Sequence, residues 1–220
     1  VAYRLDVHPL LDELLPDDRG VTLDLGCGEG QGMRRTGGRV IGADLSHDLL
    51  KGAMSHADGT GDGVVRLRAP DLSAFRSSAF GTVYAVYLLD LLPDHATFFD
   101  EAARVVAAGG ALVVIINHPV YTAPGSAPIM DEEGEVLWRW GHYFTRGSSE
   151  EPAGGFAVTF HHRPMGDLLT TARASGWILE AFEERPLSPG VVAAEPGYVG
   201  QEHIPRLAGF RWRLGPEGQR

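Results

Sequence analysis

Apolar residues gather in short runs along the first half of the chain, and several of these runs are followed by residues at helical spacing. Ser46 and Asp94 precede two of the helical stretches and favour the N-cap position, and Gly109-Gly110 is expected to end the second one. The alternation of strands and helices predicts a parallel α/β sheet with helices on both faces. The strands are expected at Val21–Leu25, Arg39–Ala43, Val64–Arg68, Thr82–Tyr87 and Ala111–Asn117.

The alternation breaks at His118-Pro119. Residues 119–160 hold prolines and aromatic side chains without a regular pattern, whereas a helix is again expected from Pro164. A segment of this length inside a compact domain usually has a function. We expect one domain over residues 1–220, with residues 119–160 inserted after the fifth strand as a lid or substrate wall. Two further strands are expected near Trp177–Glu183 and Arg206–Leu214.

Composition and charge limit the classes of partner that the protein is expected to bind. The net charge of −10 repels nucleic acid, and the apolar runs are too short to span a bilayer. The first residues lack the pattern of a signal peptide, and Cys27 is the single cysteine, which excludes an internal disulfide. We expect a cytoplasmic protein that binds neither nucleic acid nor membranes. The sequence leaves its oligomeric state open.

The segment Thr22–Gly32 joins the first strand to a cluster of glycines and a helix start, an arrangement that lets a ligand lie against bare backbone. The glycine spacing does not fit the Gly-x-Gly-x-x-Gly pattern of dinucleotide sites. Asp24 and Glu29 would also repel a pyrophosphate. A cofactor without phosphates that carries an ammonium and a sulfonium meets neither objection, and S-adenosylmethionine is such a cofactor.

Three more elements follow successive strands at the same predicted edge of the sheet. Asp44 ends the second strand, about where an acid that accepts from ribose hydroxyls is found in such sheets. Asp71-Leu72 follows the third strand, where a carboxylate and a backbone N–H can bind an adenine edge, and Tyr87-Leu88 leaves the fourth. Each element alone has an ordinary structural explanation. Together they predict a site for S-adenosylmethionine, with S-adenosylhomocysteine as the product.

With these motifs in place, the chain resembles the class I S-adenosylmethionine-dependent methyltransferases, of the bacterial small-molecule kind related to ubiquinone and menaquinone biosynthesis enzymes. This resemblance implies a seven-stranded sheet in the order 3-2-1-4-5-7-6 with the last strand antiparallel. The matching motifs specify the fold and the cofactor, but they give little information about the substrate. The matching pieces are Leu14–Asp17, Thr22–Gly30, Gly42–Ser46, Val106–Gly110, His118-Pro119, His162-Arg163, Ser175–Trp177 and Glu183–Pro186.

The resemblance also implies roles for individual residues. Asp24 would brace the glycine loop, and the backbone of Gly26, Cys27 and Gly28 would contact the amino-acid part of the cofactor. The remaining contacts would come from Asp44 and Leu45 at the ribose and adenine, Asp71 and Leu72 at the adenine, and Tyr87 and Leu88 at the sulfonium. Two departures stand out. The segment from Gly30 to Arg39 is several residues shorter than usual, and Asp90 replaces a histidine that relatives often carry.

Methyl transfer requires an aligned acceptor and exclusion of water, and a base where the acceptor starts protonated. His118, after the fifth strand, is either that base or a residue that shapes the exit turn. His162, beside Arg163, is either catalytic or, as we favour, a latch that holds the insertion down. The aromatic residues Trp138, Trp140 and Tyr143 either wall a pocket for a flat or apolar acceptor or form a small core within the insertion.

No metal is expected, because the acidic run Asp131–Glu133 has no histidine at ligand spacing. The function expected from the sequence is methyl transfer to an oxygen, nitrogen or carbon of a small metabolite. Methyl transfer to RNA or protein is an alternative, against which the net charge of −10 counts. A protein that binds the cofactor without catalysis is another, which the shortened first helix and Asp90 keep open.

Overall fold

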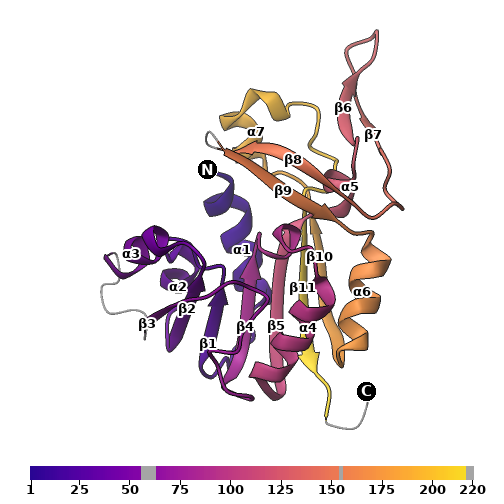
Figure 1. The fold of residues 1–220 in the computed structure, drawn as a ribbon. Helices are drawn as coiled ribbons and strands as arrows, with labels where there is room; N and C mark the ends of the chain where they lie inside the picture. The colour runs from indigo at the N-terminus through magenta and orange to yellow at the C-terminus, as the bar shows by residue number, and fades with distance from the viewer. Residues whose placement is uncertain (56–62, 154–155, 217–220) are drawn as a thin grey trace.

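A seven-stranded sheet forms the centre of the protein, in the computed structural model, which describes residues 1–55, 63–153 and 156–216. The strand order is β10-β11-β5-β4-β1-β2-β3 (Figure 1). This confirms the predicted order 3-2-1-4-5-7-6, with β11 as the seventh strand and β10 as the sixth. The bounds are β1 Thr22–Leu25, β2 Val40–Asp44, β3 Gly63–Arg66, β4 Phe80–Val86, β5 Val106–Asn117, β10 Trp177–Arg185 and β11 Leu207–Leu214.

Five adjacent strands, β3, β2, β1, β4 and β5, are parallel to one another. In contrast, β11 runs antiparallel to both of its neighbours, β5 and β10. The carboxyl ends of the parallel strands therefore lie at one edge of the sheet. Because β11 is reversed, its first residue reaches the same edge, where Leu207 pairs with Asn117 at the end of β5. This edge collects the loops that follow Leu25, Asp44, Arg66 and Val86.

Helices cover both faces of the sheet. On one face, Phe98, Phe99 and Ala102 of α4 join the main apolar core with Leu168 of α6, and the indole of Trp177 donates to the carbonyl of Phe99 over 3.1 Å. On the other face, α1 packs its leucines in a cluster with Tyr84 and Val113. The helices are η1 Tyr3–Val7, α1 His8–Leu14, α2 Gln31–Thr36, α3 His47–Ser55, η2 Leu89–Leu91, α4 His95–Val105, α5 Pro119–Thr122, α6 Met165–Ala174, α7 Pro189–Ala194 and η3 Pro196–Tyr198.

The two predicted N-caps are confirmed. Ser46 Oγ accepts from the Leu49 N–H over 3.3 Å, and Asp94 Oδ1 accepts from the Thr97 N–H over 3.1 Å. The expected end of α4 at Gly109-Gly110 is wrong, because α4 ends at Val105 and β5 starts at the next residue. The two glycines instead lie within a register shift between β4 and β5, where a Cβ on Gly110 would come within 2.5 Å of the Gly81 carbonyl oxygen.

Residues 119–160 are more regular than expected. The structure gives two hairpins, β6 Ala127–Met130 with β7 Val136–Arg139, and β8 Gly147–Ala153 with β9 Phe156–His162. Two-stranded hairpins have free edges and so tolerate the prolines at 128 and 152 that argued against strands. The orange β8 and β9 lie across the upper ends of β4 and β5, while β6 and β7 project beyond them (Figure 1).

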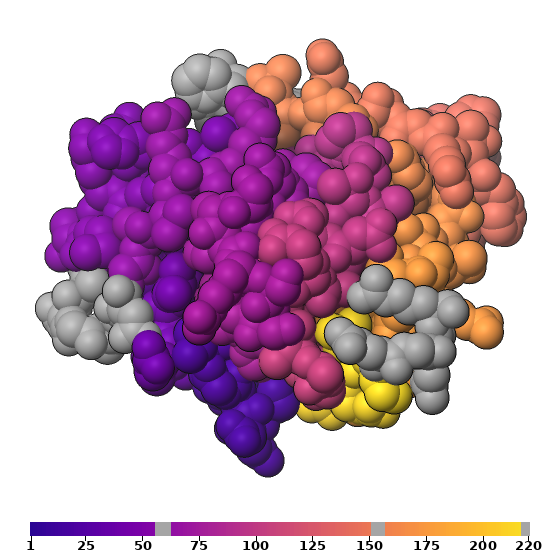
Figure 2. All heavy atoms as spheres, turned by 60° about the horizontal axis from the view of Figure 1, so that its bottom comes forward, coloured from indigo at the N-terminus to yellow at the C-terminus, as the bar shows by residue number. Residues whose placement is uncertain are grey.

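The view in Figure 2 turns the lower edge of Figure 1 towards the reader. There the indigo-to-magenta first half of the chain and the orange-to-yellow second half form adjoining parts of one surface. No helix among the described residues has the length and apolarity that crossing a membrane requires.

Candidate functional site

A cavity of about 360 Å³ lies at the carboxyl edge of the sheet, against the loops that follow β1 to β4. It brings together five of the residues singled out in the sequence, namely Gly26, Asp44, Leu45, Tyr87 and Leu88. Its volume falls within the usual range for small-molecule sites, ~300–1,000 Å³. The other lining residues are Leu25, Ala43, Leu49, Leu67, Arg68, Ala69, Val86, Leu91 and Leu92.

The glycine loop forms one wall of this cavity. Gly26 and Gly28 have φ of +81° and +52°, a region that favours glycine. The N–H groups of Gly26 and Cys27 donate to the Ala43 carbonyl over 2.8 and 3.1 Å, which ties the loop to the end of β2. Cys27 is buried, and burial raises the pKa of its thiol to about 12. The loop therefore offers a ligand bare backbone surface, with its first N–H groups already used within the protein.

Asp44 links the glycine loop to α3. Its Oδ2 accepts from the Gly28 N–H over 2.9 Å and its Oδ1 from the Ser46 N–H over 2.8 Å. These two bonds fix the carboxylate at the wall of the cavity, and each oxygen keeps capacity for a further donor. Leu45 is 44% exposed and Leu49 is 38% exposed beside it. A fixed acceptor next to exposed leucines suits a ligand that has hydroxyl groups near a flat apolar ring.

Asp24 lies beneath the loop, paired across the sheet with Tyr84 of β4. The Tyr84 hydroxyl donates to Asp24 Oδ2 over 2.7 Å, and both side chains are buried. Burial raises the pKa of Asp24 to about 7 and that of Tyr84 well above its usual range. A Cβ on Gly32 would come within 2.8 Å of Asp24 Oδ2, so the start of α2 also packs on this carboxyl group. The position of Asp24 agrees with bracing of the loop.

Tyr87 leaves β4 with φ of +54°, an uncommon value for a residue with a side chain. Its N–H donates to the Ile115 carbonyl over 2.8 Å, which keeps the end of β4 next to β5. The turn directs the chain into η2 and places Tyr87 and Leu88 in the cavity wall. Burial raises the pKa of the Tyr87 hydroxyl to about 12, so this group stays protonated at neutral pH.

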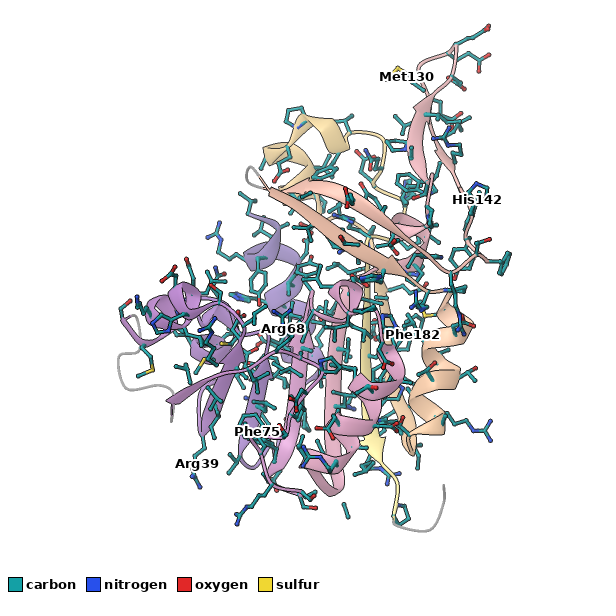
Figure 3. The ribbon with its side chains drawn as sticks, viewed as in Figure 1. Arg39, Arg68, Phe75, Met130, His142 and Phe182 are labelled. Atoms are coloured by element: carbon teal, nitrogen blue, oxygen red, sulfur yellow. The ribbon has the colours of Figure 1, made fainter. Side chains whose placement is uncertain are left out.

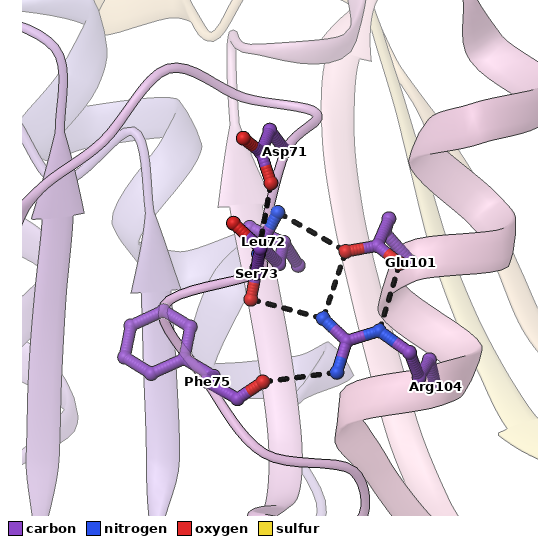
Figure 4. A network of polar contacts seen from close by, with 6 residues as sticks. All are labelled: Asp71, Leu72, Ser73, Phe75, Glu101 and Arg104. Atoms are coloured by element: carbon purple, nitrogen blue, oxygen red, sulfur yellow. Dashed lines mark hydrogen bonds and ion pairs between the residues drawn. The ribbon is translucent and has the colours of Figure 1, made fainter.

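Asp71 and Leu72 lie outside the walls of the first cavity. Leu72 is 1% exposed within the core, and Asp71 Oδ1 accepts from the Ser73 N–H over 2.9 Å, outside the cavity. Glu101 accepts from the Leu72 N–H, and Arg104 binds the carbonyls of Leu72 and Phe75, so this loop is fixed to α4 (Figure 4).

The cavity wall after β3 is made by residues just before this pair. Leu67, Arg68 and Ala69 line the cavity, and Arg68 lies towards the carboxyl edge of the sheet, whereas Arg39 and Phe75 lie towards the opposite edge (Figure 3). The loop after β3 therefore contacts the cavity through Leu67–Ala69, whereas the sequence had placed this contact at Asp71 and Leu72.

A second cavity, of about 470 Å³, lies between the end of β5 and the insertion. Asn117 and Arg206 contribute from the sheet edge. Tyr121, Thr122, Trp138, Ser149 and Phe160 contribute from the insertion, and Tyr198 from η3. The remaining lining residues are Ala123, Gly125, Ser126, Ala127 and Pro128. The insertion therefore encloses a space that is partly aromatic and partly polar.

His118 has both ring nitrogens engaged. Nε2 lies 2.7 Å from Glu184 Oε1, and Nδ1 accepts from the Val120 N–H over 3.1 Å at the start of α5. Because Nδ1 is an acceptor, the ring is neutral and its proton is on Nε2, facing the carboxylate. Burial lowers the pKa of His118, and Glu184 opposes this change only in part. The structure therefore favours the exit-turn interpretation and gives a catalytic base no free nitrogen.

Both ring nitrogens of His162 are also engaged by partners within the protein. Its Nε2 donates to the Tyr143 carbonyl over 2.7 Å, and its Nδ1 lies 3.2 Å from the Thr122 hydroxyl. The side chain is 1% exposed, and burial lowers its pKa. It connects the end of β9 to α5 and to the loop before β8. This geometry is that of a latch and argues against a catalytic role.

Three aromatic residues were expected to line one pocket, but in the structure they lie in different surroundings. Trp138 lines the second cavity, with its indole N–H 3.3 Å from the Val120 carbonyl. Trp140 is 61% exposed. Tyr143 packs on His162, and its hydroxyl accepts from the Met165 N–H over 3.2 Å. Of the three, only Trp138 lines the cavity, whereas the packing of Tyr143 on His162 fits the alternative of a small core within the insertion.

Two residues make contacts near the cavities that the sequence did not predict. Asp90 stood out in the sequence only as a departure from the family, without a predicted partner. Asp90 Oδ2 accepts from both the backbone N–H and the side-chain amide of Asn117, over 3.0 and 3.2 Å. Burial raises the pKa of Asp90 to about 7. Arg206, directly before β11, was overlooked although reversal of the last strand brings its first residues to the carboxyl edge. The strand order was therefore a signal that could have found it.

The first cavity fits S-adenosylmethionine by the chemistry of its walls. Asp44 provides acceptors for hydroxyl groups, the exposed leucines suit a flat ring, and the bare surface at Gly26 allows close approach. Among the described residues that line the space, Arg68 is the one basic side chain, so the cavity lacks the cluster of basic groups that a phosphate-bearing cofactor would require. Among the residues that the structure describes, no three His, Cys, Asp or Glu side chains gather as a metal site.

Comparison with known proteins agrees with this geometry. Residues 23–114 match a family described as a methyltransferase domain. A ubiquinone biosynthesis O-methyltransferase of Paracidovorax citrulli is 33% identical over 115 residues, 48% of this chain and 48% of that protein. A phosphatidylethanolamine N-methyltransferase of Cereibacter sphaeroides is 35% identical over 104 residues, 45% of this chain and 51% of that protein. The chain thus spans about half the length of these curated relatives.

A solved structure extends the similarity to the whole chain. A protein from Mesorhizobium loti, described as an S-adenosylmethionine-dependent methyltransferase, superposes with a TM-score of 0.79 and 28% identity. The match covers 93% of this chain and 96% of that one, so it extends well beyond residues 23–114.

Proposed function

Because the chain belongs to the class I S-adenosylmethionine-dependent methyltransferase family, we propose that it transfers the methyl group of that cofactor to a small molecule held beneath the insertion. The observation that carries this proposal is the pair of cavities on either side of the segment from Tyr87 to Asp90. Tyr87 and Leu88 line the first cavity. Asp90 binds Asn117, which lines the second.

In this proposal the first cavity holds the cofactor. Asp44 accepts hydrogen bonds from the ribose, Leu45 packs on the adenine, and Gly26 allows the amino-acid part to approach the backbone. Tyr87 and Leu88 lie at the sulfonium side. When bound, S-adenosylmethionine supplies a methyl group on a positively charged sulfur, which is already activated for displacement.

The chain's own residues then have two tasks. Asn117, held by Asp90, and the aromatic wall at Trp138 and Phe160 orient the acceptor. The insertion covers the space and excludes water, which supports its assignment as a lid. Latching of β9 by His162 keeps this cover in place. An enclosed space of about 470 Å³ suits a small acceptor better than a polymer.

The proposal is tested by titration with S-adenosylhomocysteine followed by a product-release assay over a panel of small hydroxylated, amino and carboxylate compounds. We expect binding of one S-adenosylhomocysteine per chain, and release of it from S-adenosylmethionine in the presence of at least one panel compound. Cofactor binding with turnover only on RNA or protein would overturn the small-molecule acceptor. Absence of cofactor binding would overturn the proposal as a whole.

A further inference from the structure

Arg206 brings a positive charge to the second cavity. Its guanidinium carbon lies 3.8 Å from the centroid of the Tyr121 ring, and both residues line the cavity. Tyr121 is itself held in place, because its hydroxyl donates to the buried Gln201 over 3.0 Å. The tyrosine also packs against Trp138, with ring centroids 4.7 Å apart. The stacked guanidinium is therefore fixed by its face, which leaves its edge N–H groups for other partners.

Among the described residues the Arg206 guanidinium makes neither a hydrogen bond nor an ion pair. Its charge acts on Asp90, but that carboxylate is buried and already accepts two hydrogen bonds from Asn117. Other arginines of the chain are paired, such as Arg104 with Glu101 and Arg213 with Glu180. Arg206 therefore brings a positive charge that has no ion-pair partner among the described residues to the wall of the second cavity, in a protein whose net charge is −10.

The positive charge of Arg206 acts on side chains that line the first cavity as well as on side chains that line the second. Its charge opposes the rise in pKa that burial causes at Asp90, Tyr87 and Tyr121. The guanidinium is thus close to the end of β4 as well as to the insertion. Neutral polar groups of Asn117, Thr122 and Ser149 lie around the same space, with the apolar faces of Trp138 and Phe160.

We propose that the acceptor carries an oxyanion, a carboxylate or a phosphate, which pairs with the edge of the Arg206 guanidinium while its apolar part packs on the aromatic wall. This proposal rests on the proposed function, since it assigns the second cavity to the acceptor. The planar guanidinium can donate two parallel, charge-assisted hydrogen bonds to an oxyanion. It binds a neutral amide more weakly, because the amide carries no negative charge. The remaining polar groups, Asn117 above all, then select the orientation.

The test uses three small probes of similar shape, namely benzoate, phenyl phosphate and neutral benzamide. Each is titrated against the whole chain with and without saturating S-adenosylhomocysteine. Arg206→Gln removes the charge, and Arg206→Lys keeps the charge without the planar fork. Arg213→Gln, near the far end of the strand that Arg206 precedes, is the control outside the cavity. Melting temperature confirms that each variant is folded.

We expect benzoate or phenyl phosphate to bind the parent chain and Arg213→Gln at least about tenfold more tightly than benzamide. The preference should vanish in Arg206→Gln and fall in Arg206→Lys, and the better of the two anions tells carboxylate from phosphate. Equal binding of all three probes, binding of none, or a preference that survives in Arg206→Gln would overturn the proposal. Failure to bind S-adenosylhomocysteine would contradict methyl transfer separately, because the probe preference is also measured without it.

Discussion

Asp90 in η2 and Asn117 at the end of β5 are joined through one carboxylate oxygen of Asp90, which accepts from both the backbone N–H and the side-chain amide of Asn117. Asp90 stands where the family resemblance led us to expect a histidine, and Asn117 lines the second cavity. The Asp90 carboxyl group is buried, and burial raises its pKa from 3.8 to about 7, although the bonds from Asn117 oppose this rise. Burial of this group therefore makes stability depend on pH.

The sign of this dependence follows from proton binding. A carboxyl group with a raised pKa in the folded state stabilises the fold when protonated, below about pH 4, and this contribution is lost as the pH rises through about 7. Asp90→Asn keeps an oxygen that can accept both bonds and removes the charge. We expect the free energy of unfolding at pH 8 to rise by at least about 1 kcal/mol.

Denaturant titrations at pH 5 and pH 8 measure this effect. The fall in stability between the two values should be smaller in Asp90→Asn than in the parent chain. It should not disappear, because Asp24 has a similarly raised pKa. An unchanged dependence on pH would show that Asp90 is ionised at little cost in the folded protein.

Gly26 provides a direct test of close approach at the first cavity. A Cβ there would meet Leu88 at 3.3 Å, within the cavity wall, whereas a Cβ on Gly37 would meet nothing within 4 Å. Both glycines have positive φ, and Gly37, with φ of +61° and ψ of −177°, lies in a region that only glycine adopts readily, so alanine should cost about 1–3 kcal/mol of stability at each position. We expect Gly26→Ala, but not Gly37→Ala, to weaken S-adenosylhomocysteine binding by at least about tenfold in calorimetry. Equal binding by the two variants would place the ligand elsewhere.

His118 is expected to be a structural residue. His118→Asn keeps a side-chain acceptor for the Val120 N–H, as asparagine favours the N-cap position, and loses the bond to Glu184. We expect the variant to lose about 1 kcal/mol of stability and to keep kcat within about tenfold, with an unchanged pH profile. A general base would show a loss of roughly 10²–10⁴ in kcat, and such a loss in a folded variant would restore the catalytic role.

Trp138 and Trp140 form a matched pair for the insertion. Both lie in the same segment, but Trp138 lines the second cavity and Trp140 is 61% exposed. Trp138→Ala should raise KM for the acceptor by about tenfold or more while cofactor affinity is kept, because the aromatic wall is lost. Trp140→Ala should change neither. Similar kinetics for the two variants would show that the insertion does not contact the acceptor.

Much of this architecture could be predicted because local patterns and family motifs agree with it. Strand positions, the caps at Ser46 and Asp94, and the placement of Asp44 and Tyr87 at one edge follow from short stretches of sequence. The edge residues could be named because parallel strands bring their carboxyl ends together.

The predictions failed, or left two roles open, where long-range contacts decide. The resemblance places Leu72 at the adenine, yet Arg104 and Glu101, about thirty positions later, fix its loop, and Leu72 is buried in the core. For His118 and His162 two roles stayed open, because the partners Glu184, Tyr143 and Thr122 are distant in the chain. Arg206 lacks a motif, and only the reversal of β11 brings it to the site.

The central claim is that the cavity beside Asp44 binds S-adenosylmethionine, and titration calorimetry on Asp44→Ala tests it most directly. Asp48→Ala is the control, since this acid on the next helix is exposed and, within the described part of the chain, forms an ion pair with Lys51 alone. We predict that the parent chain and Asp48→Ala bind one S-adenosylhomocysteine with the same affinity. Asp44→Ala should lose about 2–4 kcal/mol of binding free energy, the value of hydrogen bonds to a charged acceptor. Equal affinity in all three proteins, or binding by none, would contradict the assignment of this cavity to the cofactor.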